Sequence, residues 1–156
     1  MNYLGFCINM ENINFPVTQY VGWDFNSICK FNGKAIGANA DGIFELGKST
    51  TDDGVGIRAW IKTPTHDYGS AYQKRVRAGY IGGEADGKLT FSIFADEQEP
   101  VVTQIEKPGQ RQRGMKVPGN RAAKGRFLAF EIANSAGCDF SIDSLEITPI
   151  ILNKFT

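Results

Sequence analysis

The stretch from Gly42 to Ala95 constrains the fold most, because its apolar residues recur at every second position and not at helical spacing. In 57–63, for example, Ile57, Ala59 and Ile61 share one face. Clusters of Gly, Asp, Ser and Thr, which favour tight turns, separate such segments. No long window of the chain supports an amphipathic helix, so the sequence predicts an all-β protein.

Turn signals and alternation place further strands along the chain. Asn32-Gly33 is a strong hairpin signal, because both residues tolerate positive φ. Gly82-Gly83 and Asp86-Gly87 are expected to close another hairpin, after a strand whose Val76, Ala78 and Tyr80 share one face. The predicted strands are 27–31, 34–38, 43–46, 57–63, 74–81, 88–95, 101–105, 115–117, 126–134 and 140–147.

Two of these strands carry more detail. Arg126–Asn134 is apolar on both faces, which is typical of a central strand or of one covered by another chain. In 140–147 the apolar phase slips between Ile142 and Leu145. One extra residue would correct such a slip, so we expect a β-bulge near Asp143-Ser144.

Many short strands with frequent turns predict an antiparallel two-sheet β-sandwich of the jelly-roll or immunoglobulin-like type. We expect three parts: an N-terminal arm or edge strand (1–24), the sandwich (25–150) and a C-terminal tail (151–156). The arm should be extended, since Pro16 disfavours the α region in the residue before it. It either adds an edge strand or reaches a neighbouring subunit, and its apolar residues favour the second use.

The chain has 156 residues and a formal net charge of zero, so a general polyanion binder is disfavoured. Basic residues nevertheless fill 107–126 without an acid, and acids dominate 84–99. Two patches of opposite charge suit head-to-tail assembly of copies. A basic loop and an acidic loop that are both simply solvated would give the same charge pattern. Cys7, Cys29 and Cys138 show no CxxC spacing, which favours reduced thiols.

The N-terminal residues lack the basic and apolar regions of a signal peptide, and no run is long and apolar enough for a transmembrane helix. The sequence therefore predicts folding in a cytoplasm.

The order of several short motifs resembles β-sandwich modules in tail-associated proteins of tailed bacteriophages. The motifs are DGIFEL, TDDGVGIRAWIKTPTHDYGS, KRVRAGYIGG, GKLTFSIFAD and FSIDSLEITPI, spread over about residues 25–150. The matching positions are Asp41, Gly42, Phe44, Leu46, Thr51, Asp52, Asp53, Gly54, Ile57, Thr63, Asp67, Gly69, Lys74, Arg75, Arg77, Tyr80, Asp96 and 142–147.

This resemblance implies a non-enzymatic structural role in a phage virion, in tail assembly or attachment to other tail or capsid proteins. It implies a homo-oligomer that is located in the virion and assembled in the cytoplasm of the bacterial host. Candidate interface residues are Tyr3, Leu4, Phe6, Arg111, Arg113 and Lys116. Arginine is enriched at protein interfaces, and a nucleic-acid role for 111–113 is disfavoured because no aromatic residues interleave with the basic ones.

An enzyme is disfavoured by the residues themselves. His66 is the single histidine, and no serine or cysteine stands in a nucleophile-elbow pattern. Asp52-Asp53, with Asp41 and Glu45, could be considered as calcium ligands, but their spacing is not that of a calcium-binding loop. The Asp-Asp-Gly sequence is more simply explained as a tight turn. We therefore expect no catalytic, cofactor or metal site.

A carbohydrate-binding module is the alternative function. Aromatic side chains on a β-sandwich can form a platform for sugar rings, and Trp23 and Trp60 are the candidates. Alternation places Trp60 with Arg58 and Lys62 on the less apolar face of its strand. Coverage of Trp60 by another element, such as the arm, is the competing interpretation.

Overall fold

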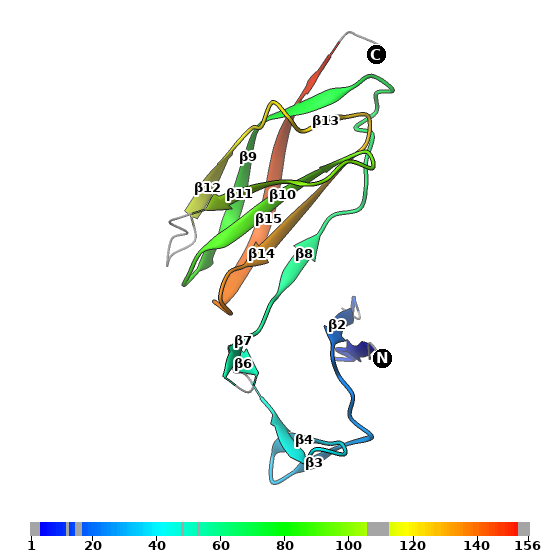
Figure 1. Ribbon diagram of the computed structural model, residues 1–156, viewed down its shortest axis with the longest axis vertical. Coiled ribbons are helices and arrows are strands. Elements are labelled where there is room, and N and C mark those ends of the chain that lie inside the picture. Colours follow the sequence, from blue (N-terminus) through cyan, green and yellow to red (C-terminus); the bar gives the residue numbers. More distant parts are fainter. Residues whose placement is uncertain are drawn as a thin grey trace. The chain divides into compact units, whose positions relative to one another are not determined.

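The computed structural model describes residues 4–11, 13–14, 17–47, 49–52, 54–105 and 113–152 (Figure 1). These residues form strands, turns and loops without a helix, and every strand pair is antiparallel. The all-β prediction is thereby confirmed. In this part of the chain, nothing helical has the length and apolar character needed to cross a membrane.

Contacts divide the chain into two compact units, Met1–Ser49 (unit 1) and Thr50–Thr156 (unit 2), which we describe separately. The sequence predicts a boundary between arm and sandwich after residue 24, and this boundary stays a prediction. The contacts group residues 25–49 with unit 1. The strands of unit 1 are β1 (Leu4–Ile8), β2 (Val17–Val21), β3 (Ser27–Phe31), β4 (Lys34–Ala38) and β5 (Ile43–Leu46). Those of unit 2 are β6 (Thr51–Asp52), β7 (Val55–Gly56), β8 (Trp60–Lys62), β9 (Lys74–Ala85), β10 (Leu89–Ala95), β11 (Val101–Ile105), β12 (Arg113–Pro118), β13 (Lys124–Gly125), β14 (Leu128–Asn134) and β15 (Phe140–Ile151).

Unit 2 contains two four-stranded sheets, which can be followed in Figure 1. In the first, here the β10 sheet, the strand order is β11-β10-β14-β8. In the second, here the β9 sheet, β9 pairs with β15 on one side and with β12 and β13 on the other. β14 has a neighbour on each side, as its apolar composition predicted.

One cluster of buried residues draws side chains from both sheets. The β10 sheet contributes Phe91 and Phe130, whose stacked ring centroids lie 5.7 Å apart. The β9 sheet contributes Ile81 and Val117, and β15 packs half-buried residues against the same cluster. Full burial of one such side chain stabilises the fold by roughly 1.5–3 kcal/mol, so this cluster holds unit 2 together.

Two irregularities offset the middle of the long β9–β15 pair. Asp143 is the extra residue on β15, because Ile142 pairs with Gly83 while Ser144 pairs with Gly82. This confirms the predicted bulge. Arg77 is the extra residue on β9, at the step between the pairs of Thr148 and Pro149. The second extra residue restores the original alignment of the two strands.

The Arg77 bulge explains an error in the predicted faces. The alternation predicts that Tyr80 shares a face with Val76, but Val76 is buried and Tyr80 is exposed, while Ile81 is fully buried. An extra residue at Arg77 reverses the alternation beyond it. The expected turn at Gly82-Gly83 was also wrong, since β9 continues through both residues to Ala85, whereas the chain does turn at Asp86-Gly87, before β10 begins at Leu89.

Unit 1 contains a two-stranded and a three-stranded sheet. Residues expected in an extended arm form a hairpin instead, in which β1 pairs with β2 from Leu4–Val21 to Ile8–Val17. The other sheet has the order β3-β4-β5. Its first turn, Asn32-Gly33, has φ values of 47° and 80°, which confirms the predicted hairpin.

Candidate interaction surfaces

The β1–β2 hairpin has one apolar face that no other described residue of unit 1 covers. Cross-strand partners point to the same side of a sheet, so this face holds every second residue of both strands. Phe6 in its middle is 63% exposed. The face, here called the hairpin face, consists of Leu4, Phe6, Ile8, Val17, Gln19 and Val21.

The opposite side of the hairpin is covered by Trp23. This indole stacks on Tyr20, with ring centroids 4.3 Å apart and planes 6° from parallel. It also lies over Gly5, where a Cβ would stand 2.5 Å from a ring carbon. Glycine is therefore required at residue 5, and one side of Trp23 is already occupied by Tyr20.

The three-stranded sheet of unit 1 is also thinly covered. Phe25 lies over Gly37, the single fully buried residue among those described in unit 1. Phe25 also contacts Trp23 and Phe44, each with centroids 6.0 Å apart. The other face leaves Phe31 69% exposed, beside an exposed ion pair between Lys34 and Glu45.

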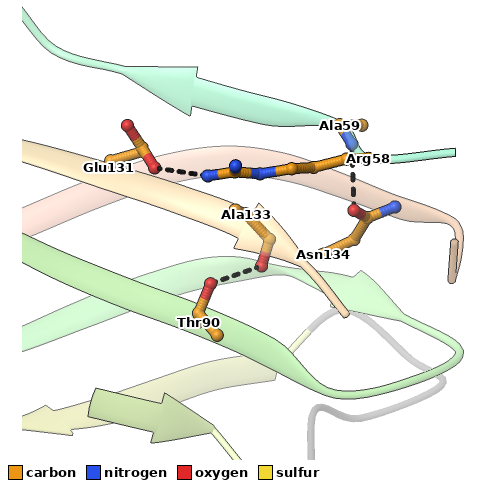
Figure 2. Close-up of polar contacts among 6 residues, drawn as sticks. All are labelled: Arg58, Ala59, Thr90, Glu131, Ala133 and Asn134. Carbon is orange, nitrogen blue, oxygen red and sulfur yellow. Dashed lines mark hydrogen bonds and ion pairs between the residues drawn. The ribbon is translucent and has the colours of Figure 1, made fainter. Parts of the chain in front are cut away.

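In unit 2, Trp60 lies on the outer face of the β10 sheet and is 49% exposed. Lys62, two residues further on the same face, places Nζ 3.6 Å from the centroid of Phe94. Arg58 reaches Glu131 at 3.6 Å, with its side chain extended along the strands in Figure 2. This face therefore combines one open indole with paired charges.

Asn134, at the end of β14, holds the segment before β8 in place. Its Oδ1 accepts a hydrogen bond from the Ala59 N–H at 2.9 Å, as Figure 2 shows. Its Nδ2 donates to the carbonyls of Ile57 (3.0 Å) and Cys138 (2.8 Å). The strand predicted at 57–63 is consequently reduced to β8, because Asn134 replaces part of the backbone pairing.

Lys74, one of the matching motif positions, is a fully buried cation, which alternation along its strand did not predict. Its Nζ donates to the carbonyls of Ser70, Tyr72 and Arg126 at 2.6, 2.9 and 2.7 Å. An ammonium has three donors, so all are used. From the other side, Asp96 accepts hydrogen bonds from the Arg126 N–H. Lys74 and Asp96, both part of the motif order, are thus structural residues.

The predicted interface residues do not gather at one place in the described chain. Leu4 and Phe6 share the hairpin face, whereas Lys116 lies exposed on β12 of unit 2. Arg113 begins β12, but its side chain is not described. Tyr3 and Arg111 lie outside the described residues.

The residues considered for chemistry are dispersed. His66 is exposed and forms a backbone bridge with Leu128. Partial burial raises the pKa of the Tyr68 hydroxyl above its ordinary value. Three exposed carboxylates, those of Glu84, Asp86 and Asp139, border an open depression of about 330 Å³.

Within the described ranges, no three His, Cys, Asp or Glu side chains are grouped to hold a metal ion. Asp53 of the considered calcium set lies outside those ranges.

Comparisons of the chain with protein-family models, with curated proteins and with solved structures give no match.

Proposed function

We propose that this chain is a non-enzymatic structural protein of a bacteriophage virion, associated with the tail. It acts by self-assembly or by docking to other tail or capsid proteins, after folding in the cytoplasm of the bacterial host. In this proposal unit 2 is a two-sheet β-sandwich that serves as a rigid body. The order of motifs along the chain and the shared core of the two sheets support it.

The observation that carries the proposal is the bare apolar surface of unit 1. Its sheets have two and three strands, and an isolated two-stranded hairpin is marginally stable at best in water. Exposed contiguous apolar patches on soluble proteins mark interaction sites. Both the hairpin face and the Phe31 side of the other sheet are such patches. A protein surface that covers them would complete unit 1.

Removal of Met1–Asn14, which deletes β1, tests this function. We expect the shortened chain to stay folded and soluble through unit 2 but to lose assembly, measured by native mass spectrometry and negative-stain imaging. A matched pair of full-length variants distinguishes loss of the hairpin face from mere shortening of the chain. Phe6→Asp places a charge on the hairpin face, whereas Thr18→Asp places one on the side that holds Trp23. Full assembly of the deleted chain would contradict the proposal.

Carbohydrate binding is the second candidate, because Trp60 keeps about half of its surface open on the outer face of the β10 sheet. Trp23 is the weaker of the two candidate platforms, since Tyr20 stacks on one side of it. A glycan array that compares the native chain with Trp60→Ala and Trp23→Ala tests this function. A sugar signal lost only with Trp60→Ala would favour it over assembly, and no signal on any glycan would remove it.

A further inference from the structure

One edge of β15 has no strand partner among the described residues. Among the described residues this strand pairs only with β9, so its other side presents backbone N–H and C=O groups without a strand partner. Long free edges are templates for an added strand, and proteins blunt them with bulges, charges and prolines. β15 carries a bulge at Asp143 and has Pro149 near its end, but the five residues Ser144–Thr148 between the two register shifts are regular. This segment is the receptive part of the edge.

The core is less well closed beside β15 than at the opposite rim. β11 lies against β12 at that opposite rim, where Ile105, Met115 and Val117 are buried. At the other rim, β8 and β15 are the last strands of their sheets. Ile61 of β8 pairs with the buried Ile132 and therefore shares its face, yet it is 49% exposed. An added strand along β15 would shield this rim.

The inward side of the receptive segment is apolar and half-buried. Leu145 and Ile147 pair with Ile81 and Gly79 on the core face of the β9 sheet. Ser144, Glu146 and Thr148 alternate with them and point to the outer face. An added strand therefore needs apolar residues at alternate positions on one side only.

β1 has the required pattern. It is five residues long, the same length as the receptive segment, and its side opposite β2 has no strand partner in the described chain. Leu4, Phe6 and Ile8 occupy every second position, with Gly5 and Cys7 between them. β2 fits less well, because Gln19 takes the middle position of its apolar side. β1 carries no charge, so Glu146 meets no like charge.

We propose that β1 of one copy adds to the free edge of β15 in a second copy, along Ser144–Thr148, with Leu4, Phe6 and Ile8 turned toward the core rim. This inference rests on the proposed assembly function and specifies the strand contact through which two copies join. Each copy has one donor strand and one receptive edge, so pairing between copies uses both on every chain. Such a head-to-tail contact supplies backbone hydrogen bonds along the strand and buries the hairpin face.

Cys7 provides the probe for this contact. If the apolar side of β1 faces the rim, Cys7 lies on the outer side with Ser144, Glu146 and Thr148. The test uses the full chain with Cys29→Ser and Cys138→Ser, so that Cys7 is its single native thiol. Ser144→Cys, Glu146→Cys or Thr148→Cys is then added singly, because the proposal does not fix which of these residues lies opposite Cys7. Mild oxidation with copper phenanthroline is followed by non-reducing electrophoresis. We expect a ladder of covalent multimers from at least one variant.

Two control variants are built on the same background. Arg121→Cys places a thiol at an exposed position away from β15, and Glu146→Cys with Cys7→Ser removes the donor thiol. Both should give no ladder. Light scattering on the uncross-linked chain distinguishes the two proposals. Multimers that form without a ladder from any β15 variant would overturn the strand contact and leave assembly standing. A chain that stays monomeric at all concentrations would overturn self-assembly itself, and an internally cross-linked monomer would assign β1 to its own β15.

Discussion

Unit 1 and unit 2 are built from similar short strands and similar residues, but only unit 2 buries them. Phe130 on β14 is 1% exposed, whereas Phe31 on β3 is 69% exposed. Both belong to apolar strands with antiparallel neighbours. The difference is that β14 belongs to a sheet whose buried face shares one core with the β9 sheet, while the residues described in unit 1 form no second layer over the Phe31 side of β3. Burial in β-proteins therefore depends on a second layer more than on the composition of one strand.

The largest expected effect comes from truncating the same residue type in both units. Phe130→Ala should lower the free energy of unfolding by about 3–5 kcal/mol, since it opens a cavity in the packed core. Phe31→Ala should change it by less than about 0.5 kcal/mol, because the side chain is already in water. Urea unfolding of the full chain measures both. Equal losses would contradict the contrast between the units.

Lys74→Met tests whether unit 2 depends on its buried cation as well as on its apolar core. The substitution keeps the apolar stem but leaves the carbonyls of Ser70, Tyr72 and Arg126 without their donor. Each unsatisfied buried group costs about 1–3 kcal/mol, so we expect a loss of about 3 kcal/mol or more. Thermal unfolding followed by circular dichroism measures it. Lys62→Met, at an exposed cation over Phe94, is the matched control and should cost about 1 kcal/mol or less.

Asn134→Ala tests the attachment of the first residues of unit 2. It removes the hydrogen bonds to the backbone of Ile57, Ala59 and Cys138, most of them at partly exposed positions. We expect a loss of about 1–2 kcal/mol, and faster amide exchange at Ala59 by hydrogen–deuterium exchange. Unchanged protection at Ala59 would show that this segment is held by its backbone contacts alone.

Arg58→Ala should have the smallest effect. The guanidinium lies 3.6 Å from Glu131 and its side chain is 75% exposed, so solvent screens the pair. Exposed ion pairs contribute about 0–1 kcal/mol, and we expect a change below about 0.5 kcal/mol. A double-mutant cycle with Glu131→Gln measures the pair directly. A coupling above 1 kcal/mol would mean that the outer face of the β10 sheet is less solvated than its exposure indicates.

Local signals in the sequence predicted local structure well. The turn at Asn32-Gly33, the bulge at Asp143 and the central position of β14 follow from backbone preference, a phase slip and two-sided apolarity. The bulge at Arg77 leaves no comparable signal, because Ala78 and Gly79 are small enough for either face. Tyr80 was consequently assigned to the wrong side.

Tertiary grouping was harder to predict. The strands of residues 27–46 alternate as clearly as those of unit 2, so their pattern gave no sign that they form a separate sheet. Lys74 also reads as an ordinary surface lysine, because its three acceptors come from positions as distant as Arg126. For the candidate surfaces, apolar residues near the N-terminus were recognisable, but their gathering on one face depends on the β1–β2 register.

The paired bulges at Asp143 and Arg77 have a consequence for how this chain can change during evolution. Each extra residue shifts the strand alignment by one, and the two shifts cancel. Deletion of Asp143 alone would leave every pair and its face in place, because Ile142 and Leu145 would then stand at the regular two-residue spacing of one strand face, and the same holds for Arg77 between Val76 and Gly79. Single-residue deletions at Asp143 and at Arg77 are therefore expected to be tolerated independently of each other, each straightening its own part of the strand pair.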